Sequence, residues 1–168
     1  MIDRKREFEQ FYNKNVDRIY RFVFFRVQNE SVAEDLTSEI FMKALKAFER
    51  YDEKISKSAW IYTIARNHLA NYYRDQKPAV DIEEVVYGLV GERGEETMEK
   101  KSDQILLGKA LDELTLEERR LVTMKHLEGY SYKEMAEILE RGDQALKVAT
   151  HRAMKKLRGV MKTITVTN

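Results

Sequence analysis

Residues 130–158 read YSYKEMAEILERGDQALKVATHRAMKKLR, and this stretch carries the signals of two short helices joined by a turn. Ser131 and Glu134 have the spacing of a capping box, in which each side chain bonds the other residue's backbone N–H. Gly142 favours a turn, and Asp143 is suited to cap the second helix. Two helices joined by a tight turn that contains glycine form a helix-turn-helix unit. The expected buried positions are Tyr132, Met135, Ala136 and Leu139, then Leu146, Ala149 or Thr150, Ala153 and Leu157.

The outward face of the second helix is polar and basic, and its members recur every three or four residues. A major groove admits one α-helix, cationic side chains neutralise phosphates, and glutamine can pair with adenine edges. A solvated basic face is the ordinary alternative, but the capped helix and the glycine turn before it favour binding to duplex DNA. The candidate DNA-binding residues are Gln144, Lys147, Val148, His151, Arg152 and Lys155.

Charge divides the chain into three parts. Residues 1–78 carry 15 basic and 12 acidic side chains, residues 79–104 carry 3 and 8, and residues 105–168 carry 12 and 9. One proline and seven glycines in 168 residues favour helices over a turn-rich β fold. We therefore predict an all-α protein with two small helical domains, 1–78 and 105–168, joined by a flexible acidic linker, 79–104.

Three or more helices are expected in the first domain. A capping box formed by Ser31 and Glu34 predicts the start of the second helix, and Pro78 is expected to stop the third. Apolar residues at helical spacing predict one buried stripe on each helix. These stripes are Phe8, Phe11, Tyr12, Ile19, Val23 and Val27; Ala33, Leu36, Ile40, Ala44 and Phe48; and Ile61, Ile64, Ala65, Leu69 and Tyr72.

The third helix also interleaves aromatic, amide and basic side chains. Such a surface can stack unpaired bases while cations hold the backbone, although Trp60 and Tyr72 are equally suited to partial burial in the core. On the second helix, Asp35, Glu39 and Lys43 lie outside the apolar stripe. A solvated, ion-paired face is the default interpretation there, and docking of a partner is the alternative.

Several classes of function are disfavoured. Without cysteine there is no disulfide framework and no thiolate ligand or nucleophile. His68, His126 and His151 lie far apart and belong to no zinc-binding pair, and no glycine loop is placed to hold a phosphate. No apolar run approaches the roughly 20 residues of a membrane span. We expect a cytoplasmic protein with no enzymatic activity, no cofactor, no metal and no membrane insertion.

Four stretches resemble the extracytoplasmic-function (ECF) group of bacterial sigma factors. SVAEDLTSEIFMKAL, which begins at Ser31, resembles the core helix of their conserved region two. AWIYTIARNHLANYYR, which begins at Ala59, resembles their promoter-melting helix. LDELTLEERR, which begins at Leu111, and YSYKEMAEIL, which begins at Tyr130, resemble their region four. The four stretches stand in the order and spacing of that family.

The resemblance implies the partners. Core RNA polymerase would be bound through its β′ clamp and β flap, promoter DNA in duplex and single-stranded form, and an anti-sigma factor would restrain the protein. The clamp would meet Asp35, Leu36, Glu39, Ile40 and Lys43. The unpaired −10 element would meet Lys54, Ser56 and Lys57 in a loop and Trp60, Arg66, Asn67, Asn71 and Arg74 on the helix. The −35 element would meet the six candidates at residues 144–155.

The recognition helix departs from the family pattern. Val148, Ala149 and Thr150 stand where the family has serine, arginine and a core leucine. If residue 149 faces the DNA, alanine there removes a phosphate contact that the family's arginine would make. Otherwise residue 149 faces the domain core. The alternative function is a stand-alone helix-turn-helix regulator, which accounts for the second domain but gives no function to the first. A third reading is a scaffold or anti-sigma-like protein that binds only proteins, against which the basic helix face argues.

Overall fold

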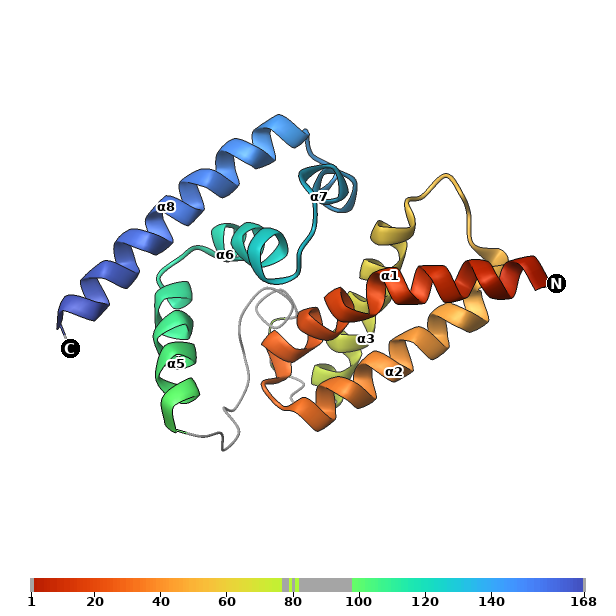
Figure 1. Ribbon diagram of the computed structural model, residues 1–168, viewed down its shortest axis with the longest axis horizontal. Helices are drawn as coiled ribbons and strands as arrows, with labels where there is room; N and C mark the ends of the chain where they lie inside the picture. The colour runs from red at the N-terminus through yellow and green to blue at the C-terminus, as the bar shows by residue number, and fades with distance from the viewer. Residues whose placement is uncertain (1, 77–78, 80, 82–97, 168) are drawn as a thin grey trace.

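The computed structural model describes residues 2–76, 79, 81 and 98–167, and every regular element in these residues is helical. Figure 1 shows two groups of helices, with the N-terminal and C-terminal ends at opposite ends of the long axis. The prediction of an all-α fold is confirmed.

The first group contains α1 (Ile2–Val27), α2 (Glu30–Ala47), the 3₁₀ turn η1 (Phe48–Arg50) and α3 (Lys57–Gln76). Each helix turns one apolar stripe inward, as the periodicity predicted, so that Ile19, Ile40 and Ile61 have no exposed surface. An aromatic cluster closes the end of the bundle next to η1. Its members are Phe8, Phe11, Phe48, Tyr51 and Trp60.

Two local predictions in this bundle were wrong. Helix α2 is capped by Asn29, whose side chain accepts a hydrogen bond from the N–H of Val32, and Ser31 already lies inside the helix. Asparagine is as strong a cap as serine, so the earlier residue takes the position. Tyr12 is 40% exposed, and its ring contacts that of Phe41 edge-on.

The second group contains α5 (Met98–Asp112), α6 (Leu116–Val122), the π-helical turn η2 (Thr123–Leu127), α7 (Tyr132–Leu139) and α8 (Asp143–Thr167). The capping box predicted at Ser131 is present, and Thr115 forms another with Glu118 at the start of α6. Helix α7 ends at Glu140, whose left-handed φ of 52° turns the chain into α8. The helix-turn-helix unit is therefore α7 and α8, with residues 140–142 between them.

Most of the predicted linker, 79–104, lies outside the described residues. Helix α5 begins at Met98, so the last seven residues of that range are helical.

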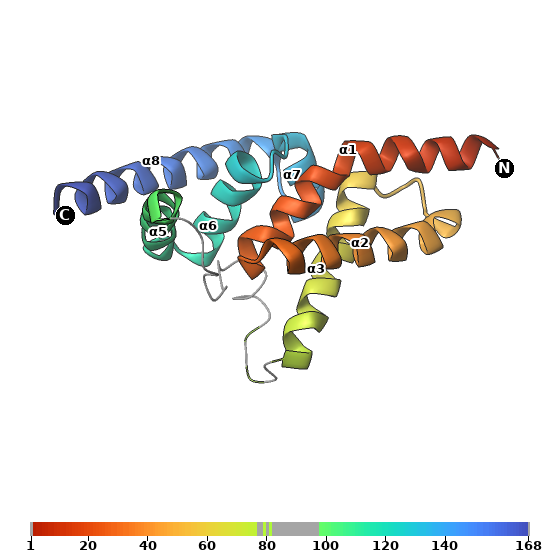
Figure 2. The same cartoon turned by 60° about the horizontal axis from the view of Figure 1, so that its bottom comes forward.

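Two hydrophobic cores form, and they do not follow the division into two domains. The smaller core lies between α5, α6 and the middle of α8, around Leu111, Val122 and Leu157. The larger core contains the first bundle and also Met124, Tyr130 and Met135 from the second group. Figure 2 shows α7 beside α1 and α3, in agreement with direct packing of α7 on α3. The helix-turn-helix unit is therefore docked on the first bundle.

Candidate nucleic-acid interface

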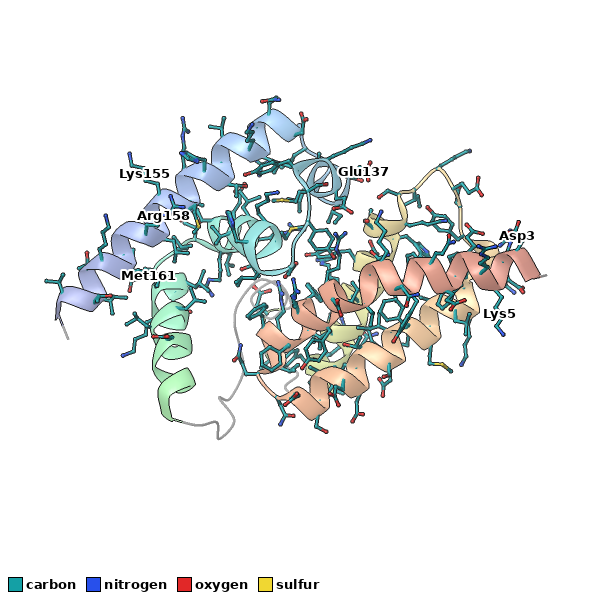
Figure 3. The ribbon with its side chains drawn as sticks, in the orientation of Figure 1. Asp3, Lys5, Glu137, Lys155, Arg158 and Met161 are labelled. Carbon is teal, nitrogen blue, oxygen red and sulfur yellow. The ribbon has the colours of Figure 1, made fainter. Side chains whose placement is uncertain are left out.

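The outward face of α8 carries all six residues predicted to contact duplex DNA, and each of them is exposed. The opposite side of the helix is buried, with Leu146 and Thr150 at 0% exposure and Leu157 at 3%. Figure 3 shows Lys155 on the side of α8 that faces away from the rest of the molecule. The exposed residues are Gln144, Lys147, Val148, His151, Arg152 and Lys155.

The cations on this face are not neutralised within the described part of the chain, where Lys147, Arg152 and Lys155 have no acidic partner. By contrast, two cations outside the face are paired. Lys156 lies 2.8 Å from Glu118, and Arg141 contacts Glu117. The unpaired cations are available to phosphates.

Residues 149 and 150 belong to the inward side of α8. Ala149 is half-buried and packs against the larger core, which supports the second of the two expectations for this position. Thr150 is fully buried, and its hydroxyl oxygen has no hydrogen-bond partner in the described residues. A buried hydroxyl without a partner destabilises the fold, so Thr150 is a weak point of this core.

On α3, the predicted single-strand-binding residues divide into two sets. Asn67, Asn71 and Arg74 are exposed along one stripe, and an Arg74 N–H donates to the amide oxygen of Asn71 at 3.1 Å. Trp60 and Arg66 are half-buried. The Trp60 ring lies 5.0 Å from that of Tyr51 and 5.7 Å from that of Phe11, so this side chain is part of the aromatic cluster.

The loop before α3 is held by its own polar groups. The hydroxyl oxygen of Ser56 accepts a hydrogen bond from the N–H of Ala59 at 3.1 Å and so caps the helix. Lys57 pairs with Glu7 at 2.6 Å, and this hydrogen bond lowers the pKa of the Glu7 carboxyl. Lys54 is exposed. Of the three loop residues predicted for the −10 element, Ser56 and Lys57 thus have structural partners.

The predicted polymerase-docking face of α2 is only partly accessible. Leu36 is 5% exposed and Ile40 is 0% exposed, so in this structure they support the helix from inside and do not reach a partner. Asp35, Glu39 and Lys43 are exposed, as predicted.

His68 from α3, which the sequence did not point to, lies between two of these exposed residues. Its Nε2 is 2.7 Å from Glu39 Oε2, and its Nδ1 is 2.7 Å from Lys43 Nζ. With the proton on Nε2, the imidazole donates to the carboxylate and accepts from the ammonium group. It thereby fixes the spacing of Glu39 and Lys43.

The contact between the two helical groups is rich in charge. Arg26 of α1 and Glu128, which follows η2, form an ion pair of 2.5 Å whose side chains are 1% and 0% exposed. Arg18 of α1 pairs with Glu134 of α7 at 2.7 Å, and Ser58 of α3 donates to the same carboxylate. The ring of Tyr130 lies under the Arg18 guanidinium.

The environment shifts the pKa of both glutamates in this contact. Burial raises the pKa of Glu128, although the guanidinium of Arg26 opposes the shift. Burial also raises the pKa of Glu134, but hydrogen bonds from the Ser131 N–H, Arg18 and Ser58 outweigh it and lower the value to about 2. The sequence marked Glu134 only as the capping-box partner of Ser131, and it did not distinguish Glu128 from an ordinary surface acid.

Within the described residues, no group of three or more histidine and acidic side chains is arranged to hold a metal ion. No helix there is long and apolar enough to cross a membrane.

Family models match both halves of the chain. Sigma-70 region 2 matches residues 11–79, and sigma-70 region 4 matches residues 104–157. The ECF RNA polymerase sigma factor BldN of Streptomyces coelicolor is 30% identical over 155 residues, which cover 89% of this chain and 58% of BldN. The chain thus spans less than two thirds of that relative. The ECF RNA polymerase sigma factor SigX of Bacillus subtilis is 24% identical over 168 residues, with 92% of this chain and 84% of SigX covered.

A solved structure shares the fold. It is the sigma factor RpoE in complex with the anti-sigma factor NepR from Bartonella quintana, with a TM-score of 0.64, 21% identity, and coverage of 93% of this chain and 97% of that one. A regulator with only a helix-turn-helix domain would not match region 2. Because both regions match in order, the chain belongs to the sigma-70 family, with region 2 in α1–α3 and region 4 in α5–α8.

Proposed function

We propose that this protein is an ECF-type sigma factor that acts in the cytoplasm, binds core RNA polymerase and directs it to particular promoters. It catalyses no reaction of its own in this proposal. The observation that carries it is the presence, in one chain with both sigma regions, of an exposed cationic recognition helix and a separate exposed amide and cation stripe on α3.

The two DNA-binding roles follow from the chemistry of these faces. The α8 face offers unpaired cations and an amide to the major groove of a −35 duplex. Asn67, Asn71 and Arg74 offer hydrogen bonds and charge to the separated −10 strand. Trp60 serves in this proposal as the support of the helix start, because its ring is held in the aromatic cluster.

Docking on polymerase is assigned to the charged face of α2. Asp35, Glu39 and Lys43 present two acids and one base on adjacent turns, and His68 orders two of them. In this assignment they meet the β′ clamp, and region 4 meets the β flap. An anti-sigma factor is a further proposed partner, since the solved relative RpoE is held by one.

The test is transcription by core polymerase supplemented with the purified chain. We expect promoter-specific transcripts and co-purification with core enzyme. The variant Asp35→Lys/Glu39→Lys should lose both while it keeps its helicity, because a single exposed charge contributes only about 1 kcal/mol and two reversals add repulsion.

The matched control reverses two exposed acids outside this face, Glu9 on α1 and Glu34 on another side of α2. The control should still bind polymerase. Equal binding by both variants would contradict the assignment of the α2 face, and the absence of any promoter-specific transcript with the unaltered chain would refute the function.

A further inference from the structure

Val148 is an apolar side chain at the centre of the cationic face of α8. It is 51% exposed, whereas the four residues of the buried stripe (Leu146, Thr150, Ala153 and Leu157) are at most 3% exposed. At 100° per residue, Val148 points about 170° away from the mean direction of that stripe. The docked first bundle does not cover it. A groove that receives α8 would therefore meet this side chain first.

The neighbours of Val148 along the helix are polar except for one small residue. Gln144 and Ala145 lie one turn before it, and His151 and Arg152 lie one turn after it, all exposed. Residues 141–168 carry seven basic side chains and one acid, Asp143. A surface of this charge fits a polyanion, so its occupant is a nucleic acid rather than an apolar protein groove.

Local structure gives no reason for valine at this position. It is a weaker helix former than alanine, lysine or arginine, and in the free chain its isopropyl group remains largely in water. Its branched side chain has one strongly preferred rotamer in a helix, so both methyl groups are held in a fixed direction. The residue is suited to a rigid apolar contact with a partner.

The major groove offers one apolar group, the C5-methyl of thymine. We propose that Val148 contacts a thymine methyl and thereby makes a T·A pair the preferred pair at one position of the −35 element. This inference rests on the proposed function and adds to it a base preference that hydrogen bonds do not supply. Gln144 and Lys147 would then read or hold neighbouring positions.

The experiment uses the full chain with core polymerase. Duplexes are selected from a pool with a random −35 region, and each thymine of the tightest duplex is then replaced by uracil, which lacks only the methyl group. One replacement should weaken binding about fourfold, the factor expected for removing one buried methyl from an apolar contact. Val148→Ala should bind thymine and uracil equally at that position.

The control is Val166→Ala, which removes an exposed valine from the C-terminal end of the same helix and should keep the discrimination. Specific binding without any effect of uracil would overturn the inference and leave the proposed function intact. A selection that returns no sequence preference would count against both. If Val148→Ala still discriminates thymine from uracil, another residue contacts the methyl group. If Val148→Ala loses binding to polymerase instead, Val148 contacts protein. Either result would overturn the inference.

Discussion

Neutralising Glu128 is expected to open the contact between the two helical groups. In the variant Glu128→Gln, the amide keeps the shape of the side chain but removes the charge that faces Arg26 at 2.5 Å. Arg26 is then left as a cation at 1% exposure. The second oxygen of Glu128 has no hydrogen-bond partner in the described residues, so the loss comes from its charge interactions, chiefly the one with Arg26 and to a smaller extent the one with Arg120.

The free-energy cost of Glu128→Gln follows from the burial of the ion pair. Removal of one partner from a fully buried ion pair typically costs about 3–5 kcal/mol, because an uncompensated charge stays in a medium of low polarity. Here the pair joins α1 to the turn after η2, so separation of the two groups returns Arg26 to water. The cost therefore appears as opening of the contact, and its upper limit is the free energy that holds the groups together.

The contact can be followed by energy transfer between two dyes. Because the chain contains no cysteine, Lys14→Cys on α1 and Lys162→Cys on α8 place single labels at exposed sites of the two groups. We expect high transfer in the parent chain and clearly lower transfer in Glu128→Gln. The double variant Arg26→Met/Glu128→Met should regain much of the transfer, since two apolar side chains need no charge partner.

The control is Glu7→Gln, which removes an ion pair of similar distance (2.6 Å) on the surface. There the side chains of Glu7 and Lys57 are each 40% exposed. Such a pair contributes at most about 1 kcal/mol, so transfer should not change. Two results together would refute the claim that this ion pair holds the groups together. The first is equal energy transfer in the parent chain, Glu128→Gln and Arg26→Met. The second is a change in thermal unfolding of the double variant that equals the sum of the changes in the two single variants.

Two further predictions concern Glu134 and Thr150. The pKa of Glu134 is lowered from 4.5 to about 2, against the effect of burial, by the Ser131 N–H of the α7 cap and by Arg18 and Ser58 across the contact. Its ionised form therefore stabilises both the cap and the contact above pH 4.5, and that stabilisation is lost as the pH falls toward 2. Since solvent screens this partly exposed group, Glu134→Gln should weaken the contact at pH 7 by roughly 1–2 kcal/mol, with the difference from the parent chain gone near pH 2 in the same transfer assay. Thr150→Val replaces a buried hydroxyl that has no hydrogen-bond partner in the described residues and should raise the free energy of unfolding by roughly 1 kcal/mol in urea titrations; a loss of stability would mean that the hydroxyl has a partner.

Signals that depend on neighbouring residues were predictable from the sequence. The capping box at Ser131 and the stripe from Leu146 to Leu157 need only short-range geometry, and both are present. The same holds for the exposed side of α8, because a helix that buries one stripe must expose the other. The cap of α2 was misplaced because Asn29 and Ser31 are both good caps and the pattern does not rank them.

Residue roles taken from the family resemblance were less secure where burial decides. Leu36 and Ile40 follow the apolar period of α2, which already predicted that they lie in the core, and their 5% and 0% exposure agrees with that period. Trp60 carried the same ambiguity. Its position beside Tyr51 and Phe48 depends on how η1 folds back on α1, which is a tertiary feature.

The contact between the two groups could not be found from the sequence, and the reason is physical. Arg26 and Glu128 are 102 positions apart, and each has the local context of an ordinary surface charge at a helix end. Charged residues are almost never fully buried unless they are paired, so only the partner explains the burial of either one.

The sequence predicted two domains from composition and turns, both of which are local. What unites Met124, Tyr130 and Met135 with the first bundle in a single core is the shape that the two groups present to each other. The apolar residues of that core provide the docking surface. The two buried charges of the ion pair determine the orientation of the two groups, because any other orientation would separate the charges.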